Sequence, residues 1–463
     1  MIKISHFLTI IIETVLLIIS CLFLKPGTGF SQSIAMNVLS LYGAIITLIT
    51  WLLVVFTTGS FFSNLSFIFL SFVLFQFGIP ILYGLDPSYN SEYMNLFSGS
   101  LINSAEEYTI FCIQLFAIGL TLALIFFSGK RKLIFAKTNW ANNTELVEKA
   151  ACIMFLFSAL LYFPATLYGA LVLHSRFSMS SIVGLAKQYY FPSAFLILCY
   201  TKNKKLIKII YIMILLECLL SMLTGGRTEG LVPLMAFIVY WINYRNNKIK
   251  FSMLTKKILM VISLFIILVL LEYIAKVRVS SSSVSITDLF QGNNFIESFI
   301  GELGFNFTSL LFVMSGIGLV GYKWGGSYLG AFVGLIPNSI DFTGIVNYFF
   351  NNLSGSTWIQ NTYGPKLGFG VGFSLIAESY FNFSYYGCVM ILVIGIAMGA
   401  IFAKSPSNCN NWEKYVEIAL LIGCLTVPRR DFYQFLKQIE YSIFLMALYL
   451  YICSKILKTK KNK

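Results

Sequence analysis

"LIKIIYIMILLECLLSMLTGGRTEGLVPLMAFIVYWI" (206–242) contains two long apolar runs on either side of a short polar segment, "TGGRTEG" (224–230). A helix needs about 20 apolar residues to cross the hydrocarbon core of a bilayer. Both runs approach that length, and the segment between them holds glycines, an arginine and a glutamate. We therefore predict two membrane helices, 205–223 and 229–244, that are joined by a tight turn at one membrane surface.

The same pattern continues through the whole chain. Of its 463 residues, 57% are hydrophobic and 11% are charged, and the mean hydropathy is +0.80. The sequence predicts an all-α polytopic integral membrane protein that forms a single transmembrane domain over residues 1–463. The absence of an internal sequence repeat argues against a transporter built from two related halves. About twelve transmembrane helices fit the apolar runs: 5–24, 34–57, 61–84, 108–128, 148–172, 184–200, 205–223, 229–244, 255–275, 372–403, 412–428 and 437–454.

The positive charges follow the expected membrane topology. The formal net charge is +14, and the basic runs lie in short links between apolar segments, for example "GKRK" (129–132), "TKNKK" (201–205) and "YRNNKIK" (244–250). Cytoplasmic loops carry an excess of lysine and arginine. This distribution places both termini in the cytoplasm, and it argues against nucleic acid as a partner.

One outer segment is much longer than the others. Residues 276–371 are expected outside the membrane, and they include two glycine-rich apolar stretches, 305–320 and 326–337, that are shorter than a span. We predict that these form short helices on the outer face or in the interface. The alternative is a helical hairpin that enters the membrane. A loop of this length is usually functional. A shorter outer loop is predicted at 85–107, with four acidic residues and no basic one.

Cysteine and histidine point to no metal chemistry. The nine cysteines contain no CxxC pair, and the only histidines are His6 and His174. This pattern argues against a disulfide framework and against metal-binding motifs. We therefore expect neither a metal nor another cofactor.

Most of the arginines are expected on the outer side of the membrane, which the topology rule disfavours for basic residues. Only two of the seven, Arg131 and Arg245, are expected in the cytoplasm. The planar guanidinium group offers paired donors that suit phosphate and carboxylate. The outer arginines therefore predict an anion-binding site at the outer rim, although each could instead contact lipid headgroups or a neighbouring acid. They are Arg176, Arg227, Arg278, Arg429 and Arg430.

Glycine-rich segments and carboxylates are expected at the same level. "GFGVGFS" (368–374) leads into the predicted span 372–403, and its Gly370, Gly372 and Ser374 offer backbone N–H groups at a helix N-terminus, which favours an anion. Ser374, Glu378 and Asn382 follow at intervals of four residues and share one helix face. A carboxylate inside a membrane helix is by default a functional candidate. The alternative for Glu378 is a structural partner for an arginine.

For the other acidic residues, the sequence leaves a choice between a catalytic and a structural role. Asp431 follows the arginine pair in "RRDFYQF" (429–435). Glu229 is either the partner of Arg227 or a catalytic base. Structural roles are expected for the remaining acids in apolar segments, namely Glu13, Glu217, Glu417 and Glu440.

These segments together resemble the Wzy-type O-antigen and capsule repeat-unit polymerases of bacteria, within the O-antigen polymerase and ligase superfamily. The resemblance covers roughly residues 215 to 435, and the N-terminal half is similar only as generic spans. It is carried by "TGGRTEG" (224–230), "GGSYLGAFVGLIP" (325–337), "GFGVGFSLIAESYFNFSYYG" (368–387) and "VPRRD" (427–431).

The resemblance implies a membrane-integral, GT-C-like glycosyltransferase of the bacterial inner membrane that works without a metal. Its substrates would be undecaprenyl-pyrophosphate-linked oligosaccharides, which it would polymerise on the outer face. Membrane lipid and a chain-length regulator protein would be its other partners. Within this frame the outer arginines, with Gly370, Gly372 and Ser374, would bind pyrophosphate. Glu378 is the first candidate for the general base, with Asp431 and Glu229 as rivals.

Two related functions compete with polymerisation. An O-antigen ligase would use the same donor. A ligase histidine is expected within the long loop, and His174 lies outside that loop, which favours a polymerase. A flippase for lipid-linked oligosaccharides would hold its charges in a central cavity and would have short loops throughout.

Aromatic residues of the long loop would suit stacking on sugar rings: Tyr322, Trp324, Tyr328, Tyr348, Trp358 and Tyr363.

Overall fold

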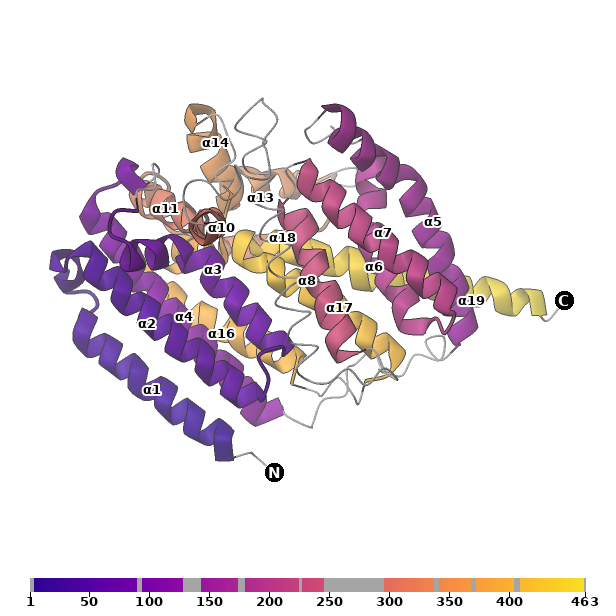
Figure 1. Ribbon diagram of the computed structural model, residues 1–463. Helices are drawn as coiled ribbons and strands as arrows, with labels where there is room; N and C mark the ends of the chain where they lie inside the picture. The colour runs from indigo at the N-terminus through magenta and orange to yellow at the C-terminus, as the bar shows by residue number, and fades with distance from the viewer. Residues whose placement is uncertain are drawn as a thin grey trace. The chain divides into compact units, whose positions relative to one another are not determined.

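A computed structural model describes residues 4–89, 94–127, 143–173, 180–224, 227–244, 295–336, 341–367, 372–403 and 409–461. Within these ranges the chain is helical and contains no strand (Figure 1). Nine of the described helices are long and apolar enough to cross a membrane. The predicted all-α polytopic membrane fold is therefore confirmed. The total of twelve spans stays a prediction, and the span predicted at 255–275 lies outside the described residues.

The chain divides into two compact units that are interleaved in sequence. Unit 1 comprises Met1–Arg131, Ile300–Ser405 and Gly423–Lys437. Unit 2 comprises Lys132–Phe299, Pro406–Ile422 and Gln438–Lys463. Each unit is described below by itself.

The core of unit 1 is built around helix α4. Figure 1 shows α4 beside α1, α2 and α16, and the four pack against one another. Helices α4 and α16 approach closely at glycines, because a Cβ atom on Gly119 would lie 2.5 Å from the Leu392 carbonyl oxygen. Gly395 and Gly399 of α16 face α4 in the same way, as small residues four apart do in membrane helix pairs. The long helices of unit 1 are α1 (Ile4–Leu24), α2 (Met36–Thr58), α3 (Asn64–Leu85), α4 (Gly99–Phe127) and α16 (Gly387–Ile401).

The start of α4 corrects the predicted outer loop 85–107. The helix begins at Gly99, so Glu106 and Glu107 lie inside it and are buried. Both oxygens of Glu106 accept from the Ser40 hydroxyl, at 2.8 and 2.9 Å, and Glu107 accepts from the Ser31 hydroxyl. Hydroxyl donors on neighbouring elements compensate the burial of these carboxylates. A hydropathy pattern contains no information about such partners.

The long outer segment contains the short helices that were predicted for it. They are α10 (Phe295–Gly304), α11 (Phe307–Val320), α12 (Gly326–Val333), α13 (Ile345–Asn352) and α14 (Gly355–Leu367). Helix α11 is largely buried against α3, α4 and α15, and it does not lie on the surface of the unit. Next to it, a Cβ atom on Gly78 of α3 would lie 2.9 Å from the Gly304 Cα atom. The alternative of a helical hairpin that enters the membrane stays a prediction.

The predicted span 372–403 is interrupted. It consists of α15 (Leu375–Phe383), a 3-10 turn (Ser384–Tyr386) and α16. Ser384 adopts the left-handed backbone region with φ of 56°, which ends the α-helical path of α15. An apolar run in sequence does not reveal such a break, because a short serine- and tyrosine-containing segment remains compatible with a helix.

Unit 2 is built mainly from four helices, α5 to α8, which are magenta in Figure 1. Helices α7 and α8 approach closely at Gly230, where a Cβ atom would lie 2.4 Å from the Cys218 carbonyl oxygen. Helix α8 begins at Arg227, two residues before the predicted start of the span 229–244. The helices are α5 (Thr144–Tyr168), continued by a π-helical turn (Gly169–Leu173), α6 (Ser181–Tyr200), α7 (Lys204–Leu223), α8 (Arg227–Asn243), the first part of α17 (Asn411–Thr426), a second π-helical turn (Glu440–Leu445) and α19 (Met446–Lys461).

Candidate functional site

Glu378 joins three elements of unit 1. Its side chain is 2% exposed and belongs to the first turn of α15, where Ser374 is the N-cap and accepts from the Ala377 N–H at 3.1 Å. Its Oε1 accepts from the Ser327 hydroxyl of α12 at 2.6 Å, and its Oε2 accepts from the Phe432 N–H at 2.7 Å. Both carboxylate oxygens therefore bind donors from other segments of the chain.

Asn382 reinforces the same contact one turn further along α15. Its amide nitrogen donates to the Ser327 hydroxyl oxygen at 2.7 Å, and its amide oxygen accepts from the Ser327 N–H at 3.2 Å. Glu378 and Asn382 thus share the helix face that was predicted, and that face binds the N-terminal end of α12.

The two arginines of "VPRRD" lie in a turn that is held from several sides. We call residues Val427–Asp431 the arginine turn; its first part is a 3-10 helix, and Arg429 and Arg430 are half-buried. Gln76 of α3 donates to the Pro428 carbonyl oxygen, which fixes the turn against a long helix. Helix α18 (Phe432–Ile439) follows directly, and its first N–H binds Glu378.

Asp431 closes the arginine turn. It is buried, and its Oδ1 accepts from the Gln434 N–H at 3.0 Å in the manner of a helix N-cap. Its Oδ2 accepts from the Ser356 hydroxyl of α14. Burial raises the pKa of Asp431 above the usual range, against smaller lowering effects of its hydrogen bonds and of the Arg430 charge. The carboxyl groups of Asp431 and Glu378 are close enough to interact electrostatically.

Unit 1 therefore brings together part of the predicted site. Glu378, Asp431, Arg429, Arg430 and Ser374 all lie at or next to the junction of α12, α15 and α18. Gly372 precedes α15 with a positive φ of 74°, as a glycine cradle requires. Three predicted residues, Arg176, Arg278 and Gly370, lie outside the described residues.

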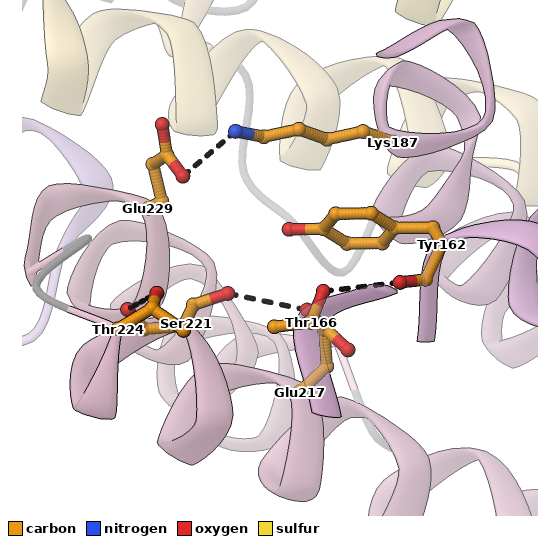
Figure 2. A network of polar contacts seen from close by, with 7 residues as sticks. All are labelled: Tyr162, Thr166, Lys187, Glu217, Ser221, Thr224 and Glu229. Atoms are coloured by element: carbon orange, nitrogen blue, oxygen red, sulfur yellow. Dashed lines mark hydrogen bonds and ion pairs between the residues drawn. The ribbon is translucent and has the colours of Figure 1, made fainter. Parts of the chain in front are cut away.

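Arg227 and Glu229 belong to unit 2, where Glu229 takes part in a different network. Figure 2 shows four side chains pointing toward one another from four helices: Tyr162 (α5), Lys187 (α6), Glu217 (α7) and Glu229 (α8). Lys187 and Glu229 form an ion pair at 2.7 Å. Glu229 thus has a basic partner, but that partner is a lysine of α6 that the sequence did not suggest.

Glu217 lies at the buried end of this network. It is fully buried, and its Oε1 accepts from the Ser221 hydroxyl at 3.2 Å (Figure 2). Among the residues that the structure describes, its Oε2 has no hydrogen-bond partner. The predicted structural role of Glu217 agrees with the Ser221 contact, and the Thr166 and Tyr162 hydroxyls also lie near its carboxyl group.

Several residues of these networks were not found from the sequence. Ser327 lies in "GGSYLGAFVGLIP" (325–337), one of the segments that carried the resemblance, but no role was predicted for its hydroxyl. Nothing in the sequence around Ser356 distinguishes it from other serines. Lys187 did carry a signal, because it is a lysine inside the predicted span 184–200. Within the described ranges, no group of three or more His, Cys, Asp or Glu side chains is arranged to hold a metal ion.

The comparison with known proteins gives one result. A protein-family model described as "O-antigen polysaccharide polymerase Wzy" matches residues 5–461, which is nearly the entire chain. No curated protein and no solved structure matches the sequence. The match covers both units and extends well beyond residues 215–435, which carried the resemblance.

Proposed function

The chain belongs to the family of O-antigen polysaccharide polymerases of the Wzy type, and from this premise we propose how it lengthens the polysaccharide. The substrates are oligosaccharide repeat units linked to undecaprenyl pyrophosphate. The growing glycan is transferred from its pyrophosphate to the non-reducing end of a new lipid-linked unit. The reaction takes place on the outer face of the bacterial inner membrane, with both termini of the chain in the cytoplasm. A chain-length regulator is proposed as a protein partner.

The arginine turn is the observation that supports this proposal most directly. Arg429 and Arg430 are consecutive, half-buried and held by contacts from α3, α14 and α15. A pyrophosphate leaving group develops negative charge, and guanidinium groups fixed in advance stabilise that charge without reorganisation. The proposed role of the two arginines is to bind the pyrophosphate of the donor, as a metal ion does in other glycosyl transfers.

The reaction needs a group that accepts one proton. The acceptor hydroxyl attacks the anomeric carbon of the growing glycan, the bond from that carbon to the pyrophosphate oxygen breaks, and undecaprenyl pyrophosphate leaves with the electron pair. The hydroxyl proton passes to a carboxylate. We assign this role to Asp431, because it adjoins the two arginines and its raised pKa strengthens it as a base.

The contacts assign different roles to the other two candidates. Glu378 lies on α15, outside the arginine turn, and its contacts with Ser327 and the Phe432 N–H join α12 to α18. Glu378 is therefore proposed as a positioning residue that fixes the arginine turn against α12. Glu229 is paired with Lys187 in unit 2 and is proposed as a partner rather than a base.

The proposal is tested by deleting the gene in its host and separating the surface glycan on a gel. A polymerase deletion leaves glycan with a single repeat unit, and loss of all glycan instead points to a flippase or a ligase. Complementation with Arg430→Ala or Arg429→Ala is expected to restore no long chains, although the protein reaches the membrane. Lys366→Ala, which removes an exposed positive charge at the end of α14, is the control and restores full-length glycan. Full-length glycan from both arginine variants contradicts the pyrophosphate assignment.

A further inference from the structure

The C-terminal end of α15 has an unusual construction. The last carbonyl groups of a helix lack partners within the helix, and here two of them accept from a distant segment. The Lys323 N–H donates to the Phe381 carbonyl oxygen at 3.1 Å, and the Trp324 N–H donates to the Asn382 carbonyl oxygen at 2.9 Å. The segment 322–324 is thereby fixed to the end of the helix that carries Glu378.

Two residues at this point adopt a backbone that side chains disfavour. Trp324 has φ of 50° and Ser384 has φ of 56°, and among the described residues only three positions other than glycine have a positive φ. Left-handed backbone at a tryptophan is rare, and such residues concentrate at functional sites. The hydrogen bond from the Trp324 N–H to the Asn382 carbonyl oxygen holds this backbone in place, so the point from which the ring extends is fixed.

Aromatic rings form a continuous series around this point. We call Tyr322, Trp324, Tyr380 and Tyr385 the aromatic cluster. The ring centroids of Trp324 and Tyr322 are 6.5 Å apart, those of Tyr322 and Tyr380 are 6.1 Å apart, and those of Tyr380 and Tyr385 are 5.7 Å apart, all edge to face. Trp324 is 75% exposed and Tyr385 is 39% exposed. The aromatic cluster therefore contains a buried ring, Tyr380, and two rings that are exposed to solvent or ligand, Trp324 and Tyr385.

Polar groups adjoin the rings. Tyr385 is an electrostatic neighbour of Glu107 and lies within hydrogen-bonding reach of the Ser104 hydroxyl. Ser104 in turn accepts from the Gln32 amide at 3.1 Å. Glu107 is 3% exposed, and its Oε1 finds no donor in the part of the chain that the structure describes. A buried carboxylate oxygen without a donor is unfavourable. Because this oxygen is covered, a ligand hydroxyl reaches it only when neighbouring side chains move, and the new hydrogen bond then stabilises the ligand.

We propose that the aromatic cluster, with Glu107 and Ser104, is a saccharide-binding site that holds one sugar of the repeat unit. Tyrosine and tryptophan offer an apolar face and a polar edge, which matches the C–H face and the hydroxyl groups of a pyranose ring. Membrane-interface aromatics, the alternative, anchor to lipid headgroups and need no buried acceptor beneath them. This site rests on the proposed function, because its ligand is the glycan that the polymerase extends.

The first test measures binding of the saccharide alone. The probe is the free repeat-unit oligosaccharide, released from the host's surface glycan so that it carries neither lipid nor phosphate. The full-length chain is purified in nanodiscs, and binding is followed by calorimetry. Trp324→Ala and Glu107→Gln are expected to weaken binding about tenfold, which corresponds to the loss of one stacked ring or one charge-assisted hydrogen bond. Phe342→Ala, which removes an exposed ring just before α13 in the same unit, is the control and binds as the unmodified chain does.

Conservative variants separate binding from misfolding. Tyr385→Phe and Trp324→Phe keep the rings, and they are expected to bind more tightly than the corresponding alanine variants. No binding by the unmodified chain, or equal binding by Trp324→Ala and Phe342→Ala, overturns the saccharide site.

The second test distinguishes glycan from lipid. The chain is placed in nanodiscs that contain brominated phosphatidylcholine, and its tryptophan fluorescence is measured. The difference in fluorescence between the unmodified chain and Trp324→Phe is the contribution of Trp324. We expect this contribution to be unquenched by bromine and to change when the oligosaccharide is added. Strong quenching by the lipid identifies Trp324 as a membrane anchor and overturns the proposal.

Failure of the site and failure of the proposed function give different results. Arg430→Ala is expected to bind the free oligosaccharide normally while it forms no long chains. If only the saccharide site is wrong, the deletion strain still shows single-repeat glycan, but Trp324→Ala restores a normal length distribution. If the proposed function is wrong, the deletion strain retains long chains whatever the binding data show.

Discussion

Glu378 in unit 1 and Glu217 in unit 2 are both buried carboxylates in apolar helices, yet their hydrogen bonding differs. Glu378 accepts from Ser327 with one oxygen and from the Phe432 N–H with the other. Glu217 accepts from Ser221 with one oxygen, and the other has no partner among the described residues. The comparison shows that buried acids in apolar helices differ in what they connect: Glu378 joins separate elements of unit 1, whereas Glu217 accepts from a serine of its own helix. Substitution by glutamine, which has the same shape, distinguishes the two.

The largest effect is expected from Glu378→Gln. An amide nitrogen placed at Oε2 would oppose the Phe432 N–H, and one placed at Oε1 would oppose a Ser327 hydroxyl that already accepts from Asn382. Either orientation leaves a buried donor unsatisfied, which lowers the free energy of unfolding by about 2 kcal/mol. The variant is expected to lose long-chain glycan, and thermal unfolding of the purified chain measures the loss of stability. An unchanged melting temperature contradicts the assignment of Glu378 as a positioning residue.

The ion pair of unit 2 is expected to have an intermediate effect. The Lys187 and Glu229 side chains are 27% and 23% exposed, so each single neutral variant leaves a partly desolvated charge and lowers stability by about 1 kcal/mol. A double-mutant cycle with Lys187→Met and Glu229→Gln measures the coupling between the two residues. The pair Glu145–Lys149 of α5, with side chains 77% and 69% exposed, is the matched control and shows less coupling. Equal coupling in the two cycles contradicts a fixed contact between α6 and α8.

A smaller effect is expected from pH. Burial raises the pKa of Asp431, so the folded chain binds this proton more tightly than the unfolded chain does. Protonation therefore favours the folded state, and stability from this group increases as pH falls through the raised pKa. Activity changes in the opposite direction, because a protonated Asp431 accepts no proton. The rate of chain extension with purified substrates is expected to fall on the acid side above the usual range of an aspartate pKa. If the residual activity of Asp431→Asn keeps the same acid limb, another group is the base.

The smallest effect is expected from Glu217→Gln. The glutamine oxygen keeps the contact with Ser221, and the amide nitrogen takes the position of the oxygen that has no hydrogen bond within the described residues. The nearby Thr166 and Tyr162 hydroxyls can rotate to accept from the amide nitrogen. The change in unfolding free energy is expected to stay within about 0.5 kcal/mol. A loss as large as that of Glu378→Gln means that the open oxygen has a partner, and it removes the difference between the two carboxylates.

The helices could be predicted from the sequence to a large extent. Long apolar runs with basic links predict α1 to α3 and α5 to α8 within a few residues, because burial in lipid requires the whole run to be apolar. The start of α4 could not be predicted in this way, since Glu106 and Glu107 are accommodated by hydroxyls of remote serines. The break at Ser384 was also missed, because it depends on contacts at the end of α15 that join residues far apart in the sequence.

The candidate site was predicted only in its ionisable residues. Arginine at the end of a predicted span and Glu378 within a predicted span are conspicuous against an apolar background, so the sequence indicated Arg429, Arg430 and Glu378. Ser327, Ser356 and Lys187 supply the partners, and partners are determined by tertiary packing. The separation of Glu229 from the unit that holds Glu378 and Asp431 likewise follows from the fold and not from spacing in the sequence.

The interleaving of the two units has a consequence for biosynthesis. The first four helices of unit 1 leave the ribosome early, but the arginine turn that completes the unit is translated near the end of the chain. Contacts between residues so distant in sequence form late and slowly. The hydrogen bond from Gln76 to the Pro428 carbonyl oxygen therefore cannot form until the end of the chain has been translated. A stop codon just before Gly423 removes little of the chain but deprives Glu378, Ser356 and Gln76 of their partners. Such truncated chains are expected to be recognised by membrane proteases as unassembled, so late nonsense mutations behave as complete deletions.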